Sequence, residues 1–302
     1  MREKIGPYHV VDLAPGRRAW LNALDLSGPT HWMVGLLEVD VTVPRQIMGA
    51  HKARTGETLS FTGFLVSCLA RAVDEDKTVQ AYLKGRSQLV LFDDVNVGVM
   101  VEHVDGENSA LMGHTIQGAN RKSYRQIHDE IRAVQSAPVP PSRGMPAWFR
   151  RAMLLPWPFS RVVKAVMGMA TRRDPTIRVA AAGTVFVTAV GMFGKGHSGW
   201  GIATTPHSLG LVVGSMAWKP AVVEGRVEPR EILNLTVLFD HDVVDGAPAT
   251  RFTRRLIELI ESGCGLDEGS NGDKLREGLE AKPREGTSGK HTPATSRRGA
   301  TG

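Results

Sequence analysis

The chain has 302 residues, of which 42% are hydrophobic and 23% are charged, and its formal net charge is +6. This composition is that of an ordinary globular protein, and it excludes a wholly disordered chain, collagen and a coiled coil. The cysteines are Cys68 and Cys264, too few for a disulfide framework or a CxxC metal site. The N-terminus lacks the apolar core of a secretory signal, and no apolar run reaches 18 residues, so we expect a cytoplasmic protein without a membrane span.

The first half of the chain alternates strand and helix patterns. Residues 32–41 predict a strand, 64–72 carry the apolar stripe of a helix, 95–101 alternate as a strand, and 124–134 form a second helical stripe. The sequence EDKTV around Lys77 has the form of a lipoyl-lysine motif. No β-hairpin domain surrounds it, so we expect Lys77 to be a surface lysine.

A basic segment follows a proline-rich stretch, SAPVPPSRG, that halts the preceding helix. Between Arg143 and Arg178 there are eight basic residues and one acidic residue, a charge of 8 − 1 = +7, which leaves 6 − 7 = −1 for the rest of the chain. The basic residues are Arg143, Arg150, Arg151, Arg161, Lys164, Arg172, Arg173 and Arg178. The whole positive excess therefore belongs to this one segment.

The same segment contains Trp148, Trp157 and Phe159, and apolar residues at helical spacing run from 159 to 170. Three interpretations remain open. The helix packs against its own subunit or a neighbour, it lies on a membrane surface with arginines at the headgroups, or it binds an acidic protein or the phosphates of coenzyme A. Nucleic acid is not expected, because no sequence-reading motif accompanies the charge.

The second half predicts three strands, 185–190, 209–216 and 232–239, and a helix over 246–262 closed by Gly263. A mixed α/β domain with a large sheet follows. The last 38 residues, 265–302, are mostly polar and contain three leucines and no aromatic residue, so we expect a disordered tail.

Several histidines show no pattern of a site. GMFGKGHSGWG at 191–201 lacks the lysine and hydroxyl ending of a phosphate-binding loop and indicates a wide turn. His197 and His207 lie near it without metal-ligand spacing, so we expect solvated loop histidines. His103 and His114 belong to no constellation, and no metal site is predicted.

The sequence DHDVVDG, at the end of the last strand, carries the chemistry. His241 and Asp245 are four residues apart, and a helix follows. A histidine at the end of a rigid strand suits a general base, because its ordinary pKa is near neutrality. Asp245 is placed either to orient the loop through a basic partner or to serve as an ordinary N-cap.

This stretch resembles the hallmark DHRxxDG of the dihydrolipoamide acyltransferases, the catalytic domains of 2-oxoacid dehydrogenase complexes, which share the chloramphenicol acetyltransferase fold. Three further blocks resemble the family in the same order along the chain: GRRAWLNAL, DDVNVGVMVEHVDG, and GTVFVTAVGMFG followed by ATTPHSLGLVVGSMAWKP. The resemblance covers about residues 15 to 263, with an interruption at the basic segment. It implies a two-layer sandwich, with a mixed β-sheet flanked by helices, over a catalytic domain of residues 1–264 that carries a basic helical insertion at about 143–178.

The resemblance also implies roles. His241 removes a proton from a thiol or hydroxyl that attacks an acyl thioester, and Asp245 holds the loop through a salt bridge to Arg17 or Arg18. Thr188 stands where the family has the serine that donates to the oxyanion. The implied assembly is a trimer with its active sites between subunits, and the implied substrate is acyl-coenzyme A.

Three departures from the family matter. The chain starts almost at the catalytic domain, so we expect a lipoyl group only from another protein, such as a lipoyl-bearing partner or 2-oxoacid dehydrogenase subunits. Asp242 replaces the family's arginine, and a carboxylate beside His241 is expected to raise the pKa of that histidine. The polar tail favours a free trimer over a cage. The alternative function is a non-catalytic trimeric scaffold or membrane-docked adaptor that retains the fold.

Overall fold

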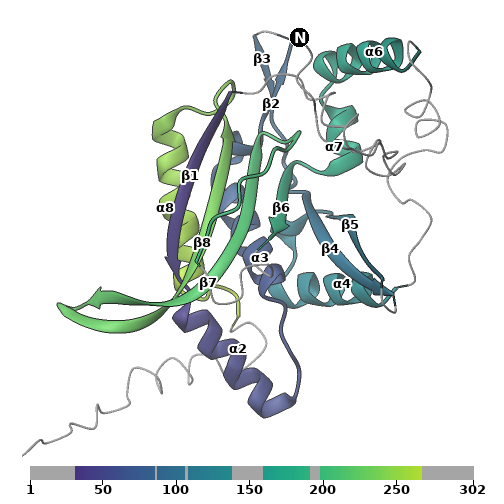
Figure 1. The fold of residues 1–302 in the computed structure, drawn as a ribbon. Coiled ribbons are helices and arrows are strands. Elements are labelled where there is room, and N and C mark those ends of the chain that lie inside the picture. Colours follow the sequence, from purple (N-terminus) through teal and green to yellow (C-terminus); the bar gives the residue numbers. More distant parts are fainter. Residues whose placement is uncertain (1–30, 86, 106–107, 138–158, 191–197, 267–302) are drawn as a thin grey trace, which may run out of the picture.

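The computed structural model describes residues 31–85, 87–105, 108–137, 159–190 and 198–266, and its main feature is one mixed β-sheet (Figure 1). The strands of this sheet are β1 (Trp32–Asp40), β4 (Val97–Asp105), β5 (Asn108–Ile116), β6 (Val185–Ala189), β7 (Leu209–Val223) and β8 (Arg226–Asp240). Their order is β1-β8-β7-β6-β4-β5, with β6 parallel to both of its neighbours and the other pairs antiparallel.

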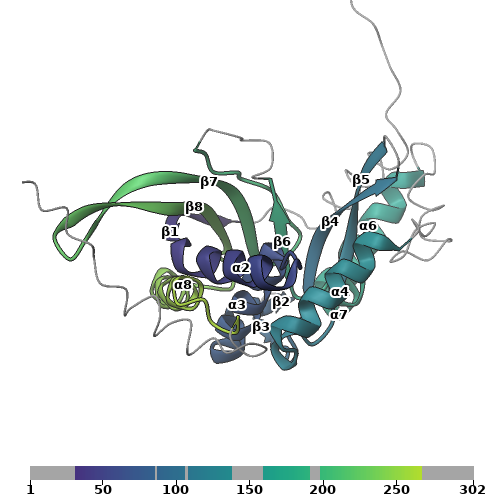
Figure 2. The same cartoon turned by 90° about the horizontal axis from the view of Figure 1, so that it is seen from below.

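Helices form the second layer. They are α2 (Thr42–Thr55), α3 (Phe61–Glu75), α4 (Tyr124–Ser136), α6 (Phe159–Arg173), α7 (Thr176–Ala182) and α8 (Gly246–Glu261), with short 3₁₀ turns η1 (Lys77–Gln80) and η2 (Ala119–Arg121). Figure 2 shows α2, α3, α4 and α8 on one side of the curved sheet. The predicted two-layer α/β architecture is confirmed.

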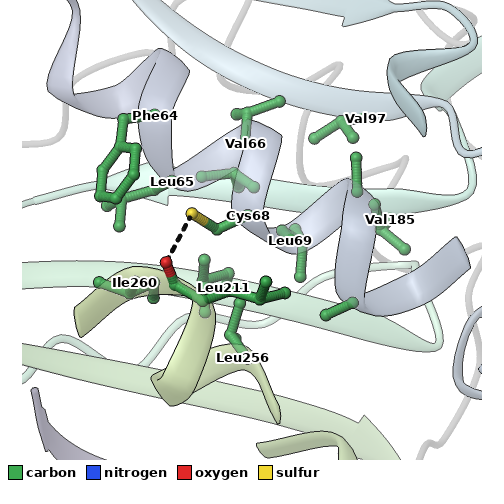
Figure 3. Close-up of a cluster of buried hydrophobic side chains, with 14 of the residues drawn as sticks. Phe64, Leu65, Val66, Cys68, Leu69, Val97, Val185, Leu211, Leu256 and Ile260 are labelled. Carbon is green, nitrogen blue, oxygen red and sulfur yellow. Dashed lines mark hydrogen bonds between the residues drawn. The ribbon is translucent and has the colours of Figure 1, made fainter. Parts of the chain in front are cut away.

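The core lies between this helical layer and the sheet, with α3 at its centre (Figure 3). Phe64, Leu65 and Leu69 of α3 are fully buried, and each such side chain contributes about 1.5–3 kcal/mol by leaving water. The α3 stripe was predicted from its spacing, and the helix starts where the hydroxyl of Ser60 accepts a hydrogen bond from the Gly63 amide at 3.1 Å. Cys68 belongs to this core, where burial raises the pKa of its thiol.

The two longest strands leave the sheet together as a ribbon (Figure 1). The sequence predicted 209–216 and 232–239, whereas β7 and β8 have 15 residues each and pair as far as Val223 and Arg226. The connecting Glu224 and Gly225 both have positive φ, 49° and 77°, as a tight hairpin requires. Trp218, exposed by 64%, lies on this ribbon.

Two other predicted helices are present, and several elements were not predicted. The predicted helix over 159–170 is α6, and the helix over 246–262 is α8, followed by Gly263 with a φ of 68°. The sequence did not predict α2, β5 or the hairpin of β2 (Tyr82–Lys84) and β3 (Gln88–Val90). Among the helices that the structure describes, none has the length and apolar character needed to cross a bilayer.

Candidate active site

A tight turn connects β8 to α8 and carries His241. The amides of Val243 and Val244 both donate to the carbonyl of Asp240 at 3.0 Å, and the Asp242 amide donates to the Asp240 carboxylate at 3.0 Å. Burial raises the pKa of that half-buried carboxyl. The His241 amide donates to the carbonyl of His31, just before β1, at 2.8 Å. The backbone of the turn is therefore fixed from both sides.

The imidazole of His241 remains accessible on this rigid base. Its side chain is 51% exposed, and Nδ1 lies 3.9 Å from Oδ1 of Asp245, a distance too long for a hydrogen bond. Asp245 has the extended N-cap conformation before α8, but its carboxylate makes no capping hydrogen bond and is 88% exposed. The N-cap prediction is therefore right for the backbone position and wrong for the side chain.

The predicted partners of Asp245, Arg17 and Arg18, lie outside the described residues. The salt bridge that would hold the turn through either arginine stays a prediction. The exposed carboxylate of Asp245 makes no described hydrogen bond that competes with it.

Asp242 has a partner that the sequence analysis missed. Its Oδ1 lies 2.8 Å from Nδ1 of His31, so the carboxylate is engaged by His31. The sequence carried no signal for this contact, because it depends on the pairing of β1 with β8, in which Trp32 is opposite Asp240. The residue before Trp32 must then lie beside the turn.

Thr188 lies on β6, far from His241 of the same chain. It pairs with Val212 on β7, which pairs with Thr236 on β8, and His241 is five residues beyond Thr236. With a rise of about 3.3 Å per residue and a strand spacing of about 4.8 Å, the two residues are roughly 19 Å apart. One chain therefore does not bring the predicted base and the predicted oxyanion donor together.

The sheet face that carries Thr188 is opposite to the helices. Val187 packs into the core, so its neighbour Thr188 points to the other face, where it is partly buried. Residues 198–208 cross this face. Ser198 accepts a hydrogen bond from Nδ2 of Asn234 at 2.7 Å, and the indole of Trp200 donates to the carbonyl of Leu37 at 2.9 Å.

His207 contradicts the prediction of a solvated loop histidine. It is buried, with Nδ1 2.7 Å from the hydroxyl of Thr205, Nε2 3.0 Å from the carbonyl of Ala182, and its ring stacked on Phe186. Burial lowers the pKa of His207 to about 4. Sequence spacing missed it because Ala182 and Phe186 are brought to His207 only by the fold. His197 lies outside the described residues.

The remaining candidates form ordinary ion pairs. Nζ of Lys77 lies 3.5 Å from Oδ1 of Asp74, as expected of a surface lysine. Nε2 of His114 lies 2.9 Å from Oε1 of Glu130. The one cluster with metal-ligand geometry in the described residues is Glu57, His128 and Asp129. Arg125 donates to Glu57 at 2.8 Å, and mainly for this reason the pKa of that carboxyl falls to about 2. We therefore interpret the cluster as an ion-pair network.

Comparisons with known proteins give a consistent picture. Residues 7–138 and 157–265 match the family model described as 2-oxoacid dehydrogenases acyltransferase (catalytic domain). The lipoamide acyltransferase component of the branched-chain alpha-keto acid dehydrogenase complex of Bacillus subtilis is 25% identical over 232 residues, which cover 75% of this chain and 46% of that protein. The dihydrolipoyllysine-residue acetyltransferase component of the Mycoplasma pneumoniae pyruvate dehydrogenase complex is 28% identical over 213 residues, 69% of this chain and 43% of that protein.

Solved structures show the same fold. The dihydrolipoamide acetyltransferase of Azotobacter vinelandii superposes with a TM-score of 0.62 at 21% identity, covering 85% of this chain and 93% of that chain. A probable dihydrolipoamide acetyltransferase of Listeria monocytogenes gives 0.60 at 19% identity, with 85% and 95% covered. The chain spans less than half of the length of the curated relatives described above.

Proposed function

The chain belongs to the 2-oxoacid dehydrogenase acyltransferase family, and we propose that it moves an acyl group between a coenzyme A thioester and a thiol, alcohol or amine. A dihydrolipoyl group carried by another protein is one such acceptor. The observation that carries the proposal is the His241 turn, in which the backbone is held by hydrogen bonds to Asp240 and His31 while the imidazole stays open to a substrate.

His241 acts as the general base in this proposal. Nδ1 is the ring nitrogen next to Asp245, so we assign Nε2 as the nitrogen that takes the proton of the acceptor. The acceptor then attacks the thioester carbonyl and forms a tetrahedral oxyanion. Collapse of this intermediate breaks the carbon–sulfur bond, and the departing thiolate of coenzyme A takes the proton back from the imidazolium.

Thr188 of a neighbouring copy supplies the hydroxyl that donates to the oxyanion. The separation of roughly 19 Å within one chain, estimated from strand geometry, leaves a second copy as the source of that group. Removal of one oxyanion donor in other enzymes costs about 10²–10³ in kcat. The Azotobacter vinelandii enzyme supports the use of a hydroxyl group and a histidine, because work on its mechanism addressed a serine and a histidine, together with an asparagine.

The partners proposed on this basis are further copies of the chain and a lipoyl-bearing protein. The relatives are components of 2-oxoacid dehydrogenase complexes, which supports this proposal.

The first test is the release of free coenzyme A from acyl-coenzyme A, with dihydrolipoamide and a panel of alcohols and amines as acceptors. His241→Ala should lower kcat by about 10²–10⁴, the usual contribution of a general base. His51→Ala is the matched control, because His51 is on α2 and pairs with Glu57. Equal background rates in wild type and His241→Ala would favour the scaffold that retains only the fold.

A further inference from the structure

Helix α6 exposes an apolar stripe that nothing in the described part of the chain covers. Phe159, Val162, Val166 and Met169 are exposed by 63%, 63%, 60% and 57%. Their spacing of three and four residues places them along one side of the helix. The apolar residues predicted at helical spacing over 159–170 are therefore divided between two sides of the helix, since Val163, Met167 and Ala170 are partly buried and these four are exposed.

The surface extends beyond the helix. α6 contacts strand β2, and the hairpin β2–β3 with the residue after it exposes Leu83, Leu89 and Leu91 by 37%, 48% and 58%. Figure 1 places this hairpin and α6 at the same end of the molecule, the end at which β1 begins. An isolated exposed leucine is normal, but several exposed apolar side chains on neighbouring elements are typical of an interaction site.

The charged residues within the sequence of α6 are of one sign. The sequence of α6 contains Arg161, Lys164, Arg172 and Arg173 and no acidic residue. A partner for this surface must therefore present negative charge together with an apolar layer. We infer that α6 lies on the surface of an anionic lipid bilayer, with its apolar stripe at the level of the acyl chains and its basic residues near the headgroups.

Other occupants fit the charge less well. A second copy that met this surface with its own α6 would bring another +4 helix against the first one. Residues 1–30 carry 4 − 3 = +1, residues 138–158 carry 3 − 0 = +3, and residues 267–302 carry 7 − 6 = +1, so none supplies an acidic excess. The last of these also contains only two leucines as large apolar residues. The family match skips 139–156, so the sequence that leads into α6 is particular to this chain within the comparison.

Vesicle flotation of the full chain tests the inference. Wild type should bind phosphatidylcholine vesicles with about 30 mol% phosphatidylglycerol at least about tenfold better than pure phosphatidylcholine vesicles, and about 0.5 M salt should weaken the binding. The variant Val162→Asp/Val166→Asp should lose about tenfold or more in binding. Its control is Val222→Asp/Val227→Asp, which changes two equally exposed valines on the β7–β8 ribbon and should bind like wild type.

A second pair of variants distinguishes the effect of the charge on α6 from the effect of the net charge of the protein. Arg161→Gln/Lys164→Gln should weaken binding about tenfold, whereas Arg226→Gln/Arg251→Gln removes the same charge elsewhere and should not. Circular dichroism confirms that each variant is folded. Absence of flotation for wild type, or unchanged flotation of Val162→Asp/Val166→Asp, would overturn the inference. Absence of flotation together with polyglutamate binding that depends on Arg161 and Lys164 would assign the surface to an acidic polypeptide instead.

Discussion

Single residues decide whether this fold can do chemistry. His241 combines a fixed backbone with an accessible ring, and its position in a turn was predictable because a strand, a turn and a helix start follow each other in the sequence. His31 was not predicted, because its contact with Asp242 depends on the register of β1 against β8. The expectation that Asp242 acts on His241 must now take account of the His31 side chain that engages its carboxylate.

His207 gives a prediction of acid sensitivity. The folded protein keeps the imidazole neutral down to about pH 4, whereas the unfolded chain takes up a proton near pH 6.5. The folded pKa is the lower one, so the unfolded state binds more protons between these values and stability falls as pH falls through this window. Over the whole window the effect is about 3 kcal/mol.

Urea denaturation at pH 7 and pH 4.5 measures this effect. His207→Gln should be less stable at pH 7, because the hydrogen bonds to Thr205 and Ala182 change, but should lose less stability on acidification than wild type does. An identical pH dependence in both proteins would show that another group is responsible.

At the scale of elements, the segment 198–208 and the strands beneath it depend on close backbone approach. β7 has an irregularity between Val213 and Met216, and a Cβ at Gly214 would lie 2.6 Å from the carbonyl oxygen of Gly199 and 2.7 Å from that of Asn234. Both contacts are to backbone, which cannot rotate away. The absence of a side chain at Gly214 therefore permits the close approach of Gly199, at the start of the segment that crosses the face carrying Thr188.

Two glycine substitutions test this. Gly214→Ala should destabilise the protein by about 1–3 kcal/mol, the usual cost of overpacking. Gly49→Ala, in the middle of α2 with no atom within 4 Å of the added methyl, should stabilise it by about 0.5–1 kcal/mol. Thermal unfolding gives both values, and a neutral Gly214→Ala would show that the segment is free to shift.

The elements themselves were only partly predictable. Helix α3 and the inner halves of β7 and β8 could be predicted from the spacing of their apolar residues, because these residues are buried in the core. Helix α2 was missed because few of its residues are apolar, with Ile47 and Met48 among those that reach the core. The outer halves of β7 and β8 were missed because they leave the core and alternate with polar residues in solvent.

At the scale of the whole molecule, the fold could be predicted from the sequence, because four blocks resemble one family in the same order. The family model matches most of the chain. The sequence could not predict which side of α6 is exposed, because the same helical spacing is compatible with a buried apolar stripe and with an exposed one. The positive charge of the chain lies around this helix. If α6 docks on a bilayer, the acyl transfer proposed for His241 takes place at a membrane surface.

The central claim is that a complete active site needs two copies of the chain, and subunit complementation tests it directly. His241→Ala and Thr188→Ala should each be nearly inactive alone. Co-expressed in equal amounts with different tags and purified as mixed assemblies through both tags, they should recover about one third of wild-type acyl transfer, because a mixed head-to-tail trimer has one interface among its three that pairs an intact His241 with an intact Thr188. Mixed assemblies no more active than the average of the two variants would contradict the account.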